Sequence, residues 1–139
     1  MKLFFDANVL FTAAHNPAGK SMLTIELGKQ GHWGLATSIY AREEARRNLE
    51  RKFPQSLAVL DLLLADIQLV EHHPAFPFPA SLAKKDQPIF QAALASGATH
   101  LLTGDLKDFG VFMNRPEETF GILVQTVGEF LGLSEARQS

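Results

Sequence analysis

Five short hydrophobic segments recur along the chain, separated by longer stretches in which polar and charged residues are mixed with apolar ones. Each segment is about four to six residues long and almost continuously apolar, which is typical of parallel strands covered on both faces. We therefore predict strands at Lys2–Phe5, Gly34–Ser38, Ile67–Glu71, His100–Thr103 and Phe120–Gln125.

The stretches between these segments carry helix signals. Ser38 is a suitable N-cap, and Pro54 is a natural stop for the helix that follows it. The segment Glu71–Ala83 is rich in proline and is interpreted as a loop. Because strands and helices mostly alternate, the pattern predicts a parallel α/β sandwich. Its helices are expected at Ser21–Gln30, Ser38–Phe53, Ser56–Ala65, Asp86–Ser96 and after the capping box Thr126–Glu129.

Size and composition limit the classes of protein that the chain can represent. With 139 residues, 46% of them hydrophobic, residues 1–139 are expected to form one domain with its own core. The sequence holds no apolar stretch long enough to span a membrane, and it has no cysteine, which excludes disulfides, thiolate zinc sites and a cysteine nucleophile. Together these features predict a cytoplasmic protein.

The charge balance restricts how the protein could hold nucleic acid. The net charge is −2, from 13 basic and 15 acidic residues. Such a chain does not bind a polyanion through bulk charge. A role on nucleic acid would need a local basic patch, bridging metal ions or a partner protein.

Acidic residues stand where predicted strands end or helices begin. Asp6 directly follows the first strand, Asp105 closely follows the fourth, and Asp86 opens the helix before the fourth. In an open parallel sheet, ligands bind in the crevice at the carboxyl ends of the strands. We therefore expect Asp6 and Asp105 to project into one crevice if their strands are neighbours.

A fourth acid comes from the helix after the second strand, where helical phase separates two candidates. Ala41, Ala45 and Leu49 define the buried stripe of this helix. Glu44 lies roughly 100° from the centre of that stripe and Glu43 roughly 160°. Glu44 can thus reach the edge of the sheet, whereas Glu43 is expected to face solvent and to pair with Arg47.

Carboxylates that converge on one crevice repel each other unless a cation is present. A donor set made only of oxygens matches Mg²⁺ or Mn²⁺ rather than Zn²⁺. One or two such ions would suit phosphodiester hydrolysis, by activating water and by offsetting charge on the leaving oxygen. Each acid, taken singly, also has a purely structural explanation. Asp86 could simply cap a helix, Asp105 and Asp108 could simply shape a turn, and Glu44 could be a solvated acid on a helix.

Four blocks of the sequence resemble those of PIN-domain nucleases, in the order of that family. The first block is a strand followed by Asp6-Ala-Asn8, and the second has Glu44 six residues after Ser38. The third begins at Lys85-Asp86, and the fourth is the run from Gly97 to Phe109, which contains Thr103, Asp105 and Asp108. Within the family, the chain looks most similar to small bacterial VapC-type toxins of toxin–antitoxin pairs.

The resemblance implies a three-layer α/β sandwich whose five-stranded parallel sheet has the order 3-2-1-4-5. It also implies that Asp6, Glu44, Asp86 and Asp105 are both catalytic and metal-binding. Asn8 and Thr103 match accessory polar positions, and Asp108 matches a position that is acidic in many relatives. The implied activity is that of an endoribonuclease dependent on Mg²⁺ or Mn²⁺, with an antitoxin partner and self-association, as a dimer, to be expected.

Basic residues near the acids are candidates for contacts with substrate phosphates. Lys84 and Lys85 stand beside Asp86, and Lys107 stands beside Asp105. A further group of basic residues on the Glu44 helix is better interpreted as a solvated face with internal ion pairs.

Two other functions are compatible with the sequence. A catalytically inactive PIN-fold module that binds RNA or protein would share the fold but would not respond to Mn²⁺. A phosphatase of the haloacid-dehalogenase type would use Asp6 as its nucleophile, because Asp6-Ala-Asn8 and the run from Gly104 to Asp108 loosely echo its motifs.

Overall fold

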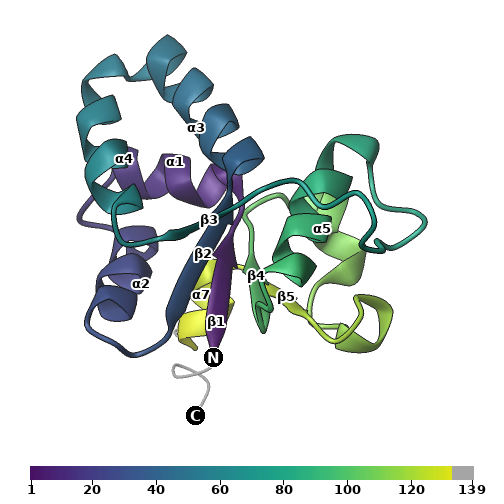
Figure 1. Cartoon of the computed structure of the whole chain (residues 1–139). Helices are drawn as coiled ribbons and strands as arrows, with labels where there is room; N and C mark the ends of the chain where they lie inside the picture. The colour runs from purple at the N-terminus through teal and green to yellow at the C-terminus, as the bar shows by residue number, and fades with distance from the viewer. Residues whose placement is uncertain (133–139) are drawn as a thin grey trace.

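A five-stranded parallel sheet forms the centre of the computed structural model, which describes residues 1–132 (Figure 1). The strand order is β3-β2-β1-β4-β5, so the predicted fold class and strand order are confirmed. The strands are β1 (Lys2–Phe5), β2 (Gly34–Ser38), β3 (Gln68–Val70), β4 (His100–Leu102) and β5 (Leu123–Gln125).

The central strand β1 is buried on both faces, as its sequence predicts. Leu3, Phe4 and Phe5 have no exposed surface, which is the environment of a strand covered by helices on two sides. Phe5 is in register with Leu102 of β4. The residues that follow these two partners therefore emerge side by side at the carboxyl end of the sheet.

Helices cover both faces of the sheet. The first four pack together on one side and α5 lies on the other (Figure 1), as right-handed crossovers leading to the two halves of the sheet require. The helices are α1 (Ala7–His15), α2 (Lys20–Lys29), α3 (Ile39–Lys52), α4 (Leu57–Leu64), α5 (Gln87–Ala95), α6 (Leu106–Phe109) and α7 (Val127–Leu131). Short 3₁₀ turns occupy Pro54–Ser56, Lys84–Asp86, Gly110–Phe112 and Pro116–Glu118.

Several helix predictions are confirmed, including their capping residues. The Ser38 side chain accepts a hydrogen bond from the backbone N–H of Ala41 at 3.0 Å and begins α3. Thr126 and Glu129 form the reciprocal capping box that begins α7. Glu71–Ala83 contains no helix or strand, in agreement with its interpretation as a loop.

Two helices are absent from the sequence prediction. The α1 helix starts directly after β1 because Asp6, expected only as the end of a strand, is also the N-cap of a helix. The short α6 helix interrupts the predicted direct connection between the fourth and fifth strands.

Some predicted bounds are also wrong. The last strand begins at Leu123 rather than Phe120, because Phe120 and Gly121 have φ angles of 54° and 90° and form a turn. Predicted residues at the ends of β3 and β4 also lie outside the strands. None of the helices within residues 1–132 has the length and hydrophobicity needed to cross a bilayer.

Candidate metal centre

Asp6 is held rigidly at the carboxyl end of β1. Its side chain is buried, and its Oδ1 accepts a hydrogen bond of 2.7 Å from the backbone N–H of Ala7. Its Oδ2 accepts two more, from the Thr103 hydroxyl at 2.7 Å and from the Asn8 amide at 3.1 Å. The carboxylate therefore has one fixed orientation, set by residues from two strand ends.

The same residues tie the end of β4 to the start of α1. The Thr103 hydroxyl accepts a hydrogen bond of 3.0 Å from the backbone N–H of Asp105, and the Asn8 side-chain oxygen accepts one of 2.7 Å from the N–H of Gly104. Thr103 and Asn8, named as accessory positions from the sequence, thus both contact Asp6 and the loop that carries Asp105.

Three aspartates converge beside this network. Asp86, Asp105 and Asp108 each offer a carboxylate oxygen, and these oxygens lie within 4.8 Å of one another. We call these three residues the aspartate cluster. Asp105 serves two purposes, because its Oδ1 accepts a hydrogen bond of 3.1 Å from the N–H of Asp108 while its Oδ2 faces the cluster.

Asp86 stands at the N-cap position of α5, but the interpretation of its side chain as a simple helix cap is wrong. Its side chain accepts no capping hydrogen bond and instead joins the aspartate cluster from the 3₁₀ turn before the helix. The side chain is buried, unlike that of most helix-capping acids at a protein surface.

The two glutamates of α3 differ as helical phase predicts. Glu44 lines a small cavity of about 200 Å³ together with Asn8 and Phe11, and its charge acts on Asp6. Glu43 is half exposed and pairs with Arg42 at 3.0 Å, so the predicted pair with Arg47 is wrong. Adjacent side chains on a helix normally diverge, so a pair between neighbouring residues is not predicted by helical phase.

Other basic side chains of α3 are engaged in local polar contacts. Arg46 pairs with Asp61 of α4, and Arg51 donates a hydrogen bond to Asn48 at 3.1 Å. These contacts agree with the interpretation of this helix face as solvated and internally paired.

Lys85 lies inside the aspartate cluster. Its Nζ is 3.3 Å from Asp86 Oδ2, 3.4 Å from Asp105 Oδ2 and 2.9 Å from Asp108 Oδ2. Lys84 and Lys107, the other predicted phosphate contacts, are exposed and form none of these ion pairs. The sequence offers no signal for this placement beyond the adjacency of Lys85 and Asp86.

The electrostatics of the site indicate an excess of negative charge. Burial raises the pKa of Asp6, against the hydrogen bonds that lower it, and Glu44 raises it further. Burial also raises the pKa of Asp86 to about 6, with smaller contributions in the same direction from Asp6 and Asp105, although Lys85 opposes the shift. Two acids with raised pKa values in one crevice form a site that is stabilised by a cation.

Lys85 supplies part of the missing positive charge. Its partial burial alone would lower the pKa of its ammonium, but the hydrogen bond to Asp108 and the charges of Asp86 and Asp105 outweigh this and raise it. The hydrogen bond from Lys85 lowers the pKa of Asp108. The donors are all carboxylate oxygens, which fits Mg²⁺ or Mn²⁺ and not a metal that prefers nitrogen or sulfur.

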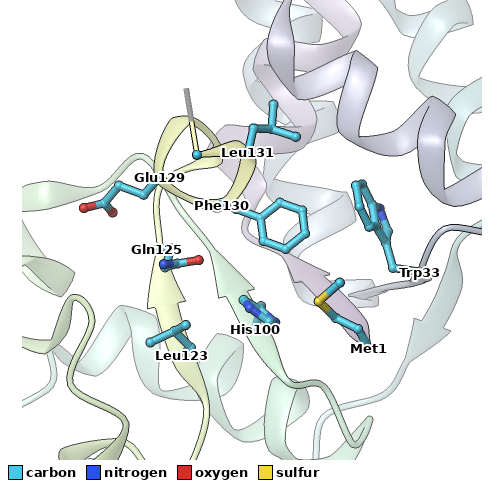
Figure 2. Close-up of a pocket in the computed structure, with 9 residues that line it drawn as sticks. Met1, Trp33, His100, Leu123, Gln125, Glu129, Phe130 and Leu131 are labelled. Carbon is cyan, nitrogen blue, oxygen red and sulfur yellow. The ribbon is translucent and has the colours of Figure 1, made fainter. Parts of the chain in front are cut away.

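A hollow of about 360 Å³ adjoins the ends of β1 and β4. It is lined by Asn8, Thr103 and Gly104 and by three further hydroxyl side chains, those of Thr12, Ser21 and Thr126. A larger hollow of about 490 Å³ lies elsewhere, near the starts of β1 and β4, where Met1, Trp33, His100 and Phe130 surround it (Figure 2). It contains none of the predicted site residues.

The order of the five parallel strands matches that of the PIN-domain fold. The sequence matches no family model, and it matches none of the curated proteins. The relationship is therefore visible in the fold alone.

Two solved structures that share this fold come from VapBC assemblies. One is a VapBC2 structure from Rickettsia felis, bound to a DNA fragment from their promoter, which superimposes with a TM-score of 0.63 at 15% sequence identity. The other is VapBC-1 from nontypeable Haemophilus influenzae, with a TM-score of 0.57 at 16% identity. Each similarity covers 91% of this chain and 98% of the other.

Proposed function

We propose that this protein is a metal-dependent endoribonuclease. The observation that carries the proposal is the aspartate cluster of Asp86, Asp105 and Asp108. The charges of Asp6 and Asp105 act on Asp86, and that of Glu44 acts on Asp6. Such a concentration of carboxylates in one crevice is expected where a divalent cation is part of the working site.

Asp6, Glu44, Asp86 and Asp105 would hold one or two Mg²⁺ or Mn²⁺ ions, with Asp108 beside them as the third member of the aspartate cluster. Such an ion would supply an activated water and would offset charge on the phosphate, which suits a hydrolysis that yields 5′-phosphate and 3′-hydroxyl ends. Thr103 and Asn8 position Asp6 by donating hydrogen bonds to its Oδ2. No histidine is needed as a general base.

The substrate would approach across the hollow beside Asn8 and Thr103. Its hydroxyl side chains, on Thr12, Ser21 and Thr126, can hydrogen-bond to phosphate and ribose oxygens without adding charge. Lys84 and Lys107 are exposed, stand two residues from Asp86 and Asp105 respectively, and would supply the electrostatic attraction.

We infer further that the protein is the toxin of a toxin–antitoxin pair. The two solved structures described above are VapBC assemblies, which supports an antitoxin protein as partner. Self-association as a dimer is part of the same proposal. A phosphatase that uses Asp6 as nucleophile is disfavoured, because the Asp6 side chain is buried and both of its oxygens accept hydrogen bonds.

A cleavage assay on a mixed RNA pool tests the activity. We expect wild-type protein to cut RNA with Mg²⁺ or Mn²⁺ and not with EDTA, and Asp6→Asn to be inactive. A matched control is Asp66→Asn, which removes an exposed acid that pairs with Lys29. Persistent absence of metal-dependent cleavage across diverse cellular RNAs would favour the inactive binding module instead.

A further inference from the structure

Lys85 is the feature of the site that the proposed chemistry leaves unexplained. A single ammonium group lies 2.9–3.4 Å from oxygens of all three members of the aspartate cluster. The same three residues each offer a carboxylate oxygen close enough to the others to hold a metal ion. The lysine therefore occupies the place in which a cation would be most strongly stabilised.

We infer that Lys85 is a tethered cation that fills the aspartate cluster in the metal-free protein and leaves it when a divalent ion binds. This inference rests on the proposed metal centre and assigns Lys85 a positioning role within it. The ammonium and the metal would be alternative occupants of the same carboxylates.

The geometry around Lys85 permits the ammonium to lie either in the aspartate cluster or in solvent. The backbone of the 3₁₀ turn is anchored, since the Tyr40 hydroxyl donates a hydrogen bond of 3.3 Å to the Lys85 carbonyl and the buried Asp86 follows directly. The Lys85 side chain is nevertheless 65% exposed. Its four-carbon stem can thus swing into solvent without disturbing the fold.

Charge makes the two occupants exclusive. Asp105 Oδ1 accepts a hydrogen bond from the backbone N–H of Asp108, and Asp105 Oδ2 contacts the Lys85 ammonium. Asp86 Oδ2 also contacts the Lys85 ammonium. A divalent ion at these oxygens would lie within a few ångströms of the ammonium, at which distance two cations repel even near a solvated surface.

The arrangement would have two consequences. In the absence of metal, the lysine limits repulsion among the carboxylates and keeps the cluster assembled. In the presence of metal, its release reduces the apparent metal affinity, because the ion must first displace an internal competitor. The site would then be filled only where divalent ions are plentiful, as Mg²⁺ is in cells.

The test is a Mn²⁺ titration followed by calorimetry, with Lys85→Met compared with wild type. Lys84→Met and Lys107→Met are matched controls, because each removes one exposed positive charge from a neighbouring position. We expect Lys85→Met to bind Mn²⁺ about tenfold more tightly, each control to change affinity by no more than about twofold, and Lys85→Arg to restore weaker binding.

Stability separates this role from that of an ordinary surface ion pair. Lys85→Met should unfold at a lower temperature than wild type in EDTA, whereas the two should unfold together in saturating Mn²⁺. A lysine with only a structural role would make the variant less stable in both conditions.

Lysine NMR on the wild-type protein provides a second measurement that needs no variant. The Lys85 ammonium signal should be protected from exchange with water in EDTA and lose that protection as Mg²⁺ is added. If Lys85→Met bound Mn²⁺ no more tightly than the controls, or the ammonium stayed protected at saturating Mg²⁺, the inference about Lys85 would be overturned. The proposed metal centre would not be affected by that result. If neither wild type nor Lys85→Met bound Mn²⁺, the proposed metal centre itself would fail.

Discussion

Neutralising Asp86 should stabilise the metal-free protein, although it removes a residue of the proposed active site. Burial raises the pKa of this carboxyl to about 6 from an ordinary value of 3.8. Folding therefore favours the protonated form, and the ionised form is a source of instability at neutral pH. Asp86→Asn imitates the protonated side chain in shape and charge.

The size of the effect follows from the difference between the two pKa values. A change from 3.8 to about 6 corresponds to about 3 kcal/mol of folding free energy. Solvent near the exposed Lys85 side chain screens part of this, which leaves about 1.5 kcal/mol. For a chain of this length, that gain would raise the unfolding temperature by roughly 5 °C.

The sign of the pH dependence is set by the same values. Below about pH 3.8 the carboxyl is protonated in both states and has no effect. As the pH rises to about 6, the unfolded chain ionises first, so the wild-type protein progressively loses stability relative to Asp86→Asn. Above about pH 6 the carboxyl is ionised in both states, and the difference in stability between wild type and Asp86→Asn is complete and constant.

Thermal unfolding in EDTA at a series of pH values measures this difference directly. We expect the curves of wild type and Asp86→Asn to converge near pH 4 and to separate by pH 7, with the variant the more stable. Saturating Mn²⁺ should reverse the order, since only the intact site gains binding energy. If Asp86→Asn were less stable than wild type in EDTA at pH 7, ionised Asp86 would not be a source of instability.

Three further changes should act on separate parts of the account. Thr103→Val removes the buried donor to Asp6 and should cost about 1–3 kcal/mol in urea unfolding and weaken Mn²⁺ binding; unchanged binding would show that Asp6 needs no such positioning. Glu44→Gln should abolish RNA cleavage in a timed assay, whereas Glu43→Gln on the same helix should retain it, and the opposite result would reverse their assignment. Ser38→Ala removes the N-cap of α3 and should lower the free energy of unfolding by about 1 kcal/mol without affecting Mn²⁺ affinity.

The sequence predicts the sheet well because each strand is apolar and short. The two faces of β1 are both buried, so its residues need no alternation, and this pattern is hard to confuse with a surface helix. The boundary between β1 and α1 is harder to predict, because Asp6 directly follows the strand and is itself the N-cap of the helix. A helical spacing of apolar residues at Val9, Leu10, Ala13 and Ala14 is the signal that would have identified α1.

The candidate site could be predicted in outline but not in its contacts. Strand ends gather Asp6 and Asp105 by topology, and helical phase distinguishes Glu44 from Glu43. The insertion of Lys85 among three aspartates depends on how the turn before α5 meets the loop after β4. Local sequence patterns carry no information on such long-range contacts, and a lysine beside an aspartate is more often a solvated neighbour.

The most direct test of the central claim is a crystal of the wild-type protein grown with Mn²⁺ and measured for anomalous scattering. We expect an anomalous peak bounded by carboxylates of Asp6, Glu44, Asp86 and Asp105, with the Lys85 ammonium displaced from the aspartate cluster. Well-ordered density for these acids in millimolar Mn²⁺ with no anomalous peak among them, and with Lys85 still in place, would contradict it.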